Sequence, residues 1–202
     1  MNEQYYEKLL NINTSAEASR VQKSFHYHRY EPTPYSALEV LFREYELNSS
    51  DRIVDFGCGK GRLNFLIKRL FNSSVVGVEM NELFYKAALE NRRSYLEKDK
   101  QAGEKIQFYC GLAEEYIVNP LDNCFYFFNP FSIQVFIKVI NNILTSVEET
   151  SRTVEIVLYY PSEDYIYYLE NYTSFVLKKE VRLEELYEQN PNERFLIYHL
   201  TY

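Results

Sequence analysis

The segment from residue 51 to residue 160 alternates short apolar runs with amphipathic stretches, and this alternation constrains the fold more than any other feature of the chain. Runs such as "RIVDF" (52–56) and "NCFYFFN" (123–129) are too apolar to face water, which is typical of strands buried on both sides. Between the strands, "RLNFLIKRLF" (62–71) and "SIQVFIKVINNILTSVEE" (132–149) carry apolar residues at helical spacing. Strands and helices that alternate in this way predict a parallel sheet covered by helices on both faces.

The last part of the chain has a different pattern. The segments "SFVLKKEVRL" (174–183) and "RFLIYHLTY" (194–202) have the composition of strands, and the polar link between them is too short and irregular for a crossover helix. We expect the two to pair antiparallel as an edge hairpin. Together with runs at 75–80, 105–111 and 153–161, this predicts an α/β fold with a doubly wound, seven-stranded, mostly parallel sheet and a C-terminal antiparallel strand.

Composition and charge limit the class of protein. The 202 residues are most simply one domain. A net charge of -7 argues against a broad nucleic-acid-binding surface and leaves a local basic patch as the alternative. The N-terminus lacks a secretory signal, and no run of about 18 apolar residues predicts a membrane span. Cys58, Cys110 and Cys124 are scattered at or near strand ends, which indicates reduced, buried thiols in a cytoplasmic protein rather than a metal site.

The first residues form a separate segment. Residues 1–34 are polar and rich in tyrosine, and we expect them to be an N-terminal extension that acts as a lid or faces substrate. His26 and His28 within it lack a third ligand nearby and are weak support for a metal. The main domain is expected to span residues 35–202, beginning with an amphipathic helix in "YSALEVLFREYEL" (35–47). With 20 Tyr and 14 Phe, the chain has either a phenylalanine core with a tyrosine surface or a dedicated aromatic binding face.

The stretch "DFGCGKG" (55–61) links the first strand of the alternating segment to its helix. Glycines at this position let the backbone turn sharply and let a ligand lie against bare amides at a helix N-terminus. A phosphate-binding P-loop needs Ser or Thr after Gly-Lys, but Gly61 follows Lys60. A dinucleotide fingerprint needs a third glycine where Arg62 stands. The pattern present is D-x-G-x-G-x-G.

That pattern, followed by Glu79 at the end of the second strand, resembles the class I, seven-strand S-adenosylmethionine-dependent methyltransferases. The resemblance covers roughly residues 51–160 and implies S-adenosyl-L-methionine as cofactor. It implies that Asp55 holds the methionine amino group and that Glu79 accepts hydrogen bonds from the ribose hydroxyls. The other residues that the resemblance places at the cofactor are Phe56, Gly57, Cys58, Gly59, Gly61 and Met80, with Met80 packing on the adenine.

Adenine recognition departs from the family pattern. Members often carry Gly-Asp-Ala after the third strand, where the Asp bonds the adenine amino group. This chain has Gly111-Leu112-Ala113. The resemblance therefore implies that the backbone amide of Leu112 or Ala113, or the carboxylate of Glu114, makes the adenine contact instead.

The fourth strand ends in Asn129-Pro130-Phe131, where a doubly wound sheet places its reaction site. The motif resembles the Asn-Pro-Pro-Tyr/Phe motif of methyltransferases that act on amide or exocyclic amino nitrogens, without the second proline. It also resembles the Asn-Phe pair of seven-strand protein-lysine methyltransferases. In the first comparison Asn129 is the catalytic residue beside the methyl group and also contacts the cofactor, and Pro130 and Phe131 contact the substrate. The alternative is a strand-end turn in which Phe131 belongs to the core.

An aromatic box is a further expectation. Tyr30, Tyr35, Phe131 and Tyr160 are the candidates for enclosing a methylammonium group or the sulfonium. The sequence thus predicts a methyltransferase that acts by in-line displacement on a nitrogen of a protein side chain or a small molecule. Nucleic acid is a less expected partner, and no metal or membrane is expected. The alternative is a catalytically inactive protein that binds or senses S-adenosylmethionine. The sequence leaves the oligomeric state open.

Overall fold

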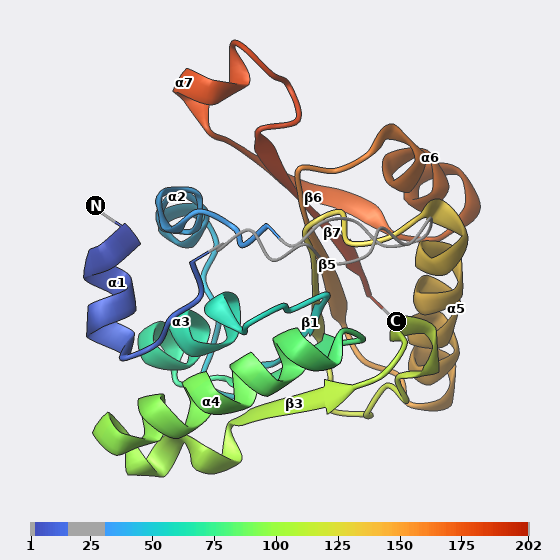
Figure 1. Ribbon diagram of the computed structural model, residues 1–202. Coiled ribbons are helices and arrows are strands. Elements are labelled where there is room, and N and C mark those ends of the chain that lie inside the picture. Colours follow the sequence, from blue (N-terminus) through green and yellow to red (C-terminus); the bar gives the residue numbers. More distant parts are fainter. Residues whose placement is uncertain (1–2, 16–30, 202) are drawn as a thin grey trace.

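A seven-stranded sheet forms the centre of the molecule in the computed structural model, which describes residues 3–15 and 31–201 (Figure 1). The strands are β1 Arg52–Phe56, β2 Ser74–Glu79, β3 Ile106–Cys110, β4 Cys124–Phe127, β5 Val154–Tyr159, β6 Val176–Arg182 and β7 Arg194–Leu200. Their order is β3-β2-β1-β4-β5-β7-β6. All neighbours are parallel except β7, which is antiparallel to both β5 and β6. The predicted doubly wound, mostly parallel sheet is confirmed.

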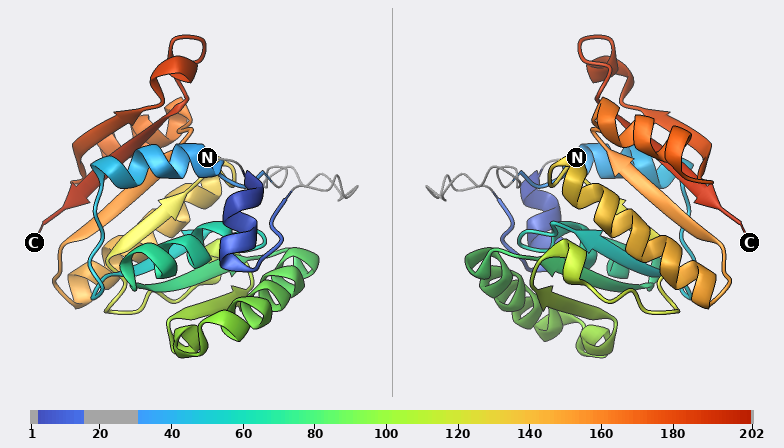
Figure 2. Two further views of the ribbon diagram at one scale, coloured as in Figure 1. Left: turned by 90° about the vertical axis from the view of Figure 1, so that its left-hand side faces the viewer. Right: turned by 90° about the vertical axis from the view of Figure 1, so that its right-hand side faces the viewer.

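Helices cover both faces of the sheet. They are α1 Glu3–Leu10, α2 Tyr35–Glu44, α3 Arg62–Phe71, α4 Glu82–Lys98, α5 Ile133–Glu149, α6 Glu163–Tyr172 and α7 Glu184–Tyr187, with 3-10 turns η1 Lys100–Glu104 and η2 Ala113–Glu115. The helices α2, α3 and α4 lie on one side of the sheet, with α1 next to them, whereas α5 and α6 lie on the other (Figure 2). Because strand side chains alternate between faces, Ile53 belongs to the core on the α3 side, and Val54 to the core on the α5 side.

The C-terminal strands pair as predicted, with one detail that the sequence does not reveal. β6 and β7 are antiparallel, but β7 enters between β5 and β6, so β6 forms the edge. The link between them contains the short helix α7 and projects beyond the sheet (Figure 1). Because β7 lies next to β5 and runs in the opposite direction, the link before β7 lies near the carboxyl ends of β4 and β5.

The prediction that all three cysteines are buried is wrong for one of them. Cys58 and Cys124 are buried, but Cys110 is exposed. It lies at the end of β3, which is an edge strand whose outer side chains are only partly covered. All three thiols are free.

Residues 3–15 are bound to the main domain by side-chain hydrogen bonds. The amide group of Asn11 donates to the carbonyl oxygen of Ser94 at 2.6 Å, and the Asn13 amide donates to Oδ1 of Asn91 at 2.8 Å. Nδ2 of Asn91 also donates to the carbonyl oxygen of Lys60, at 3.0 Å. The N-terminal segment therefore touches both α4 and the glycine loop. No helix in the described ranges is long and apolar enough to cross a bilayer.

Candidate functional site

The glycine loop lies at the carboxyl ends of the parallel strands, between β1 and α3. The amides of Gly57 and Cys58 both donate to the carbonyl oxygen of Val78, at 2.9 and 3.1 Å, which fastens the loop to β2. Gly57, Gly59 and Gly61 all have left-handed backbone conformations, with φ angles of 78°, 55° and 85°. This conformation favours glycine, so the spacing of the three glycines follows from the path of the loop.

Gly57 brings the glycine loop against the end of β4. A Cβ atom at Gly57 would lie 2.7 Å from Cβ of Pro130, closer than real Cβ contacts allow. The bare backbone of Gly57 therefore lets Asn129 and Pro130 approach the loop. The cofactor and reaction segments predicted from the sequence are in this way brought together.

Glu79 is fixed over the glycine loop at the end of β2. Its Oε2 accepts a hydrogen bond from the Gly59 amide at 2.9 Å, and its Oε1 accepts one from the Asn81 amide at 2.7 Å. Asn81 also caps α4, accepting hydrogen bonds from the backbone of Leu83 and Phe84. Burial raises the pKa of Glu79, and the backbone hydrogen bonds oppose this effect.

Asp55 is a second buried carboxyl group beside the loop, with 4% of its surface exposed. The side-chain amide of Asn64 satisfies both of its polar atoms when its nitrogen faces Asp55. In that orientation Nδ2 of Asn64 donates to Oδ2 of Asp55 at 3.0 Å, and Oδ1 accepts from the Gly77 amide at 3.1 Å. Burial, and then the nearby charge of Glu79, raise the pKa of Asp55 to about 8. Among the described residues, neither carboxylate forms an ion pair with a lysine or an arginine. A cationic ligand would stabilise the ionised form of both carboxyl groups, so the site suits such a ligand.

The residues predicted to contact adenine lie at the neighbouring ends of β2 and β3. The Gly111 amide donates to the carbonyl oxygen of Glu79 at 3.1 Å, which joins the two strand ends. Met80 is 38% exposed, Leu112 is half-buried, and Ala113 is buried at the start of η2. Their grouping creates an apolar surface next to Glu79, and their contact with adenine stays a prediction.

Two other residues of the loop region are buried. The Phe56 ring is 1% exposed and stacks on Phe127, with 5.1 Å between ring centroids. Cys58 is 8% exposed, and burial raises the pKa of its thiol well above the ordinary value. The side chains of both lie beneath the loop, so the groups that they offer to a ligand are backbone atoms.

The end of β4 has an unusual backbone. Asn129 has a φ of 39°, a left-handed conformation that asparagine adopts more readily than most residues. Pro130 is half-buried, and the Phe131 ring is 1% exposed and packs edge-on against Phe127. The hydroxyl of Tyr165 donates to the carbonyl oxygen of Phe131. Phe131 thus has the placement of a core residue, whereas Asn129 and Pro130 remain at the site.

Arg62, the first residue of α3, organises a buried network behind the loop. Its guanidinium group forms an ion pair with Glu3 at 2.6 Å, donates to Oγ1 of Thr14 at 2.8 Å and lies 4.4 Å from the ring centroid of Tyr35. The Tyr35 hydroxyl donates to Glu7 at 3.1 Å. Because the Tyr35 side chain is fully buried in this network, the substrate role predicted for it has no exposed surface to act through. Tyr30, His26 and His28 lie outside the described residues.

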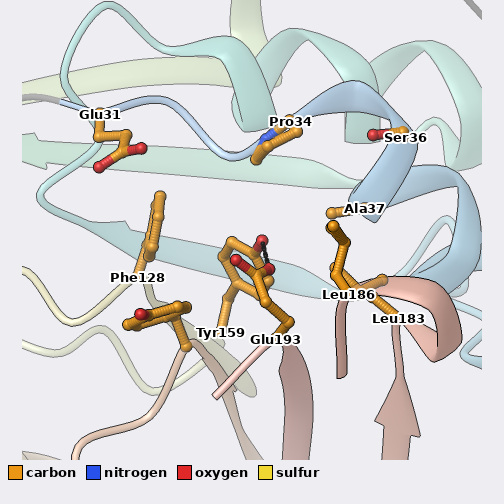
Figure 3. Close-up of a pocket in the computed structure, with 10 residues that line it drawn as sticks. Glu31, Pro34, Ser36, Ala37, Phe128, Tyr159, Leu183, Leu186 and Glu193 are labelled. Atoms are coloured by element: carbon orange, nitrogen blue, oxygen red, sulfur yellow. Dashed lines mark hydrogen bonds between the residues drawn. The ribbon is translucent and has the colours of Figure 1, made fainter. Parts of the chain in front are cut away.

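A pocket of about 300 Å³ opens on the α2 side of the sheet and is lined by Phe128, the residue before Asn129 (Figure 3). Its walls include Phe128 from the end of β4, Tyr159 and Tyr160 from the end of β5, and Glu31, Leu183 and Glu193 from outside the parallel strands. Of these residues, only Tyr160 was expected from the sequence. Phe128 directly precedes Asn129, which is the one signal that could have indicated it. Within the described ranges, no group of three or more His, Cys, Asp or Glu residues could hold a metal ion.

Comparison with known proteins gives sequence matches over part of the chain and structural matches over most of it. No family profile matches the chain. The chain is 40% identical over 58 residues to a ribosomal protein L11 methyltransferase from Thermotoga neapolitana, a match that covers 29% of this chain and 22% of that protein. A second such sequence from the same species matches at 38% identity over 58 residues. The matches thus span about a fifth of the length of these curated relatives.

Solved structures share the fold at low sequence identity. An RNA methyltransferase from Salinibacter ruber, in complex with S-adenosyl-L-homocysteine, superposes with a TM-score of 0.56 and 17% identity, covering 85% of this chain and 93% of that one. A geranyl diphosphate C-methyltransferase from Streptomyces coelicolor, also in complex with S-adenosyl-L-homocysteine, gives a TM-score of 0.54 and 11% identity, covering 82% and 77%. At these identities the likeness establishes the fold.

Proposed function

The chain has the class I, seven-strand S-adenosylmethionine-dependent methyltransferase fold, and we propose that it is an enzyme of that kind. The observation that carries the proposal is the pair of buried carboxylates, Asp55 and Glu79, that flank a bare glycine loop without a basic partner among the described residues. Buried carboxylates without a basic partner favour a ligand that brings positive charge. S-adenosylmethionine carries an ammonium and a sulfonium group, and when bound it supplies an electrophilic methyl group.

Each group at the site has a role in this proposal. Asp55 accepts a hydrogen bond from the ammonium group of the cofactor, and Glu79 accepts hydrogen bonds from the ribose hydroxyls. The loop 57–61 provides a path without side chains along the backbone. The surface formed by Met80, Leu112 and Ala113 holds the adenine. The support for these roles is the placement of the residues at adjoining ends of β1, β2 and β3.

Asn129 is the proposed catalytic residue, because it follows β4 between Phe128, which lines the pocket, and Pro130, which lies against Gly57 of the glycine loop. Its side-chain oxygen accepts a hydrogen bond from the acceptor and directs the nucleophilic lone pair toward the methyl group. Holding two reactants in line supplies much of the rate enhancement of such a displacement, so no general base is required. We propose a nitrogen of a protein side chain or a small molecule as acceptor. The free thiols support a cytoplasmic location.

Calorimetric titration with S-adenosylmethionine and S-adenosylhomocysteine tests the proposal. Both compounds are expected to bind to the folded protein with dissociation constants below about 1 mM, which corresponds to about 4 kcal/mol of binding free energy. The control is S-adenosylmethionine titrated into the Asp55→Asn, Glu79→Gln double variant, checked for folding by circular dichroism. Failure of both compounds to bind the unmodified protein would falsify the proposed function.

A further inference from the structure

The pocket lined by Phe128, the residue before Asn129, has the chemistry of a site for an organic cation. We propose that it binds the methyl acceptor as an alkylammonium ion, an amino group at the end of an aliphatic chain. This inference rests on the proposed function and specifies its substrate class. It is carried by three features of the pocket: its carboxylates, its aromatic wall and its aliphatic wall.

Two carboxylates give the pocket its negative charge. Glu193 is held in place by the Tyr159 hydroxyl, which donates to its Oε2 at 2.8 Å. The Glu31 side chain reaches toward the Phe128 ring from the segment before α2 (Figure 3). None of the ten described residues that line the pocket is a lysine or an arginine. A phosphate or carboxylate ligand would therefore find no cationic side chain among them, whereas an ammonium group would be attracted by the two carboxylates.

Three aromatic rings form the wall beneath Glu31. The centroid of the Phe128 ring lies 4.6 Å from that of Tyr159, with 52° between ring planes, and 6.5 Å from that of Tyr160. The hydroxyl of Tyr160 accepts a hydrogen bond from Nδ2 of Asn190 at 2.7 Å, which fixes this ring. The Tyr159 ring is buried behind the other two, whereas Phe128 and Tyr160 are half-buried with 62° between their planes. These two rings are the ones that can present faces to a bound cation, and aromatic faces attract cations.

The opposite wall is aliphatic. Ala37 from α2 and Leu183 and Leu186 from the link before β7 gather on the side of the pocket away from Glu31 (Figure 3). Such a surface suits the methylene chain of an alkylamine, as each CH₂ that leaves water contributes about 0.8 kcal/mol. The volume of about 300 Å³ is enough for one such chain but small for a nucleoside stacked between walls.

The carboxylate end of the pocket is tied to the strand that leads to Asn129, so it is suited to hold the amino group that receives the methyl group. Phe128 is adjacent in sequence to Asn129, and a 2.7 Å hydrogen bond between the hydroxyls of Thr33 and Tyr126 ties the segment that carries Glu31 to β4. In the reaction, the ammonium group gives one proton to solvent and its nitrogen lone pair forms the new bond to the methyl carbon. The electron pair of the broken C–S bond leaves on sulfur, and the product is an N-methylated ammonium ion.

The test compares two probes that differ in charge and little in shape. Saturation-transfer NMR titrations with n-pentylammonium and with 1-pentanol are carried out on the full chain in the presence of S-adenosylhomocysteine. We expect n-pentylammonium to bind about tenfold or more tightly than 1-pentanol, in line with the strength of cation–π and charge attraction. Equal binding of the two probes overturns the inference.

A matched pair of variants locates the effect in the pocket. Glu31→Gln removes one carboxylate that lines the pocket and should remove most of the preference for n-pentylammonium. Glu185→Gln removes the same charge from an exposed residue of α7 that does not line the pocket, and should preserve the preference. An equal loss in both variants would show general attraction by an acidic protein and would contradict the inference.

Labelled cofactor distinguishes the source of the amine. Methyl-labelled S-adenosylmethionine is incubated with the protein and either poly-L-lysine or n-pentylamine. Label on poly-L-lysine assigns a protein lysine side chain, and label on n-pentylamine alone assigns a small amine. A protein that binds the cofactor but labels neither probe, and prefers neither pentyl probe, overturns the inference and leaves the proposed function intact. Absence of cofactor binding is a failure of the proposed function instead.

Discussion

The backbone amide of Gly59 donates a hydrogen bond of 2.9 Å to Oε2 of Glu79. The glycine loop after β1 and the carboxylate after β2 are therefore one structural unit, and the second oxygen of Glu79 is held by the Asn81 amide. A carboxylate has about four lone-pair sites, so Glu79 can accept further hydrogen bonds from the ribose hydroxyls that we propose as its ligands. The backbone amides fix the orientation of its carboxylate in the absence of a ligand.

Replacing Glu79 by Gln should weaken cofactor binding. The side-chain nitrogen of Gln is itself a donor, so it cannot accept a hydrogen bond from a backbone N–H. The variant therefore loses the negative charge and one of the two hydrogen bonds from the Gly59 and Asn81 amides. We expect S-adenosylmethionine affinity to fall by about tenfold to a hundredfold in calorimetric titration. Glu82→Gln is the control, because Glu82 is exposed at the start of α4 and should leave affinity unchanged. Similar affinities for both variants would place the ribose elsewhere.

Asp55→Asn should stabilise the protein while it weakens cofactor binding. The pKa of Asp55 is about 8 against an ordinary 3.8, so the charged form is disfavoured in the folded state. The folded protein loses stability as pH rises from about 4 to 8, and the variant does not. At pH 7 we expect the variant to gain about 2 to 4 kcal/mol in free energy of unfolding, measured with urea. Below pH 4 the gain should vanish.

The same carboxyl group should release a proton when the cofactor binds at pH 7. The ammonium group of the cofactor stabilises the ionised form of Asp55, which lowers its pKa from about 8. Calorimetry in two buffers of different ionisation enthalpy measures this release. The Asp55→Asn variant should show none. Release of equal size in the variant would assign the proton to another group.

Gly57→Ala should disturb the end of β4. The new Cβ would lie 2.7 Å from Cβ of Pro130, and the φ of 78° is unfavourable for alanine. We expect a loss of about 1 to 3 kcal/mol in stability and a large loss of cofactor affinity. Gly103→Ala is the control, because no atom lies closer than 3.8 Å to its new Cβ. Normal cofactor affinity in the Gly57 variant would show that Pro130 can move away from the new Cβ without disturbing the site.

Asn129→Gly should separate catalysis from binding. Glycine accepts the φ of 39° without strain, so the backbone at the end of β4 is retained while the side chain is removed. We expect methyl transfer to slow by about tenfold or more, with cofactor affinity changed by less than about threefold. A variant with the normal rate would leave Asn129 as a strand-end turn residue only.

Arg62→Met should loosen the N-terminal segment. Arg62 is 5% exposed, and its loss leaves Glu3, Glu7 and Thr14 without their shared donor. We expect a loss of about 2 to 4 kcal/mol in stability and faster limited proteolysis within residues 3–15. Arg43→Met removes an exposed arginine that pairs with Glu39 on one face of α2, and should change little. Equal proteolysis rates would show that other contacts hold the segment.

The fold and the proximity of the glycine loop to Glu79 could be predicted because their signals are local. Each signal lies within a few residues of the chain and depends on local structure. The alternating apolar pattern reflects strand and helix periodicity, and the glycines at 57, 59 and 61 reflect left-handed backbone conformations. Glu79 lies directly at the end of a strand. The exposure of Cys110 was missed because it depends on which strand lies at the sheet edge, a matter of topology and not of the β3 sequence.

The acceptor pocket could not be predicted for a different reason. Glu31, Phe128 and Glu193 are far apart in the chain, and no spacing rule connects them. They meet only because the segment before α2 crosses the end of β4 and because β7 runs opposite to its neighbours. The burial of Tyr35 likewise depends on α1, a helix that the polar, tyrosine-rich N-terminus did not indicate.

Because of the reversed direction of β7, the residues proposed to bind the cofactor and several residues of the pocket come from distant parts of the chain. Because β7 is antiparallel, the link at 183–193 opens at the same rim as the parallel strands, and it supplies Leu183, Leu186 and Glu193 to the pocket. Insertions in this link would lengthen one wall without shifting the register of any strand. Acceptor preference can therefore diverge, by evolution or by loop grafting, while the cofactor residues on β1 and β2 remain unchanged.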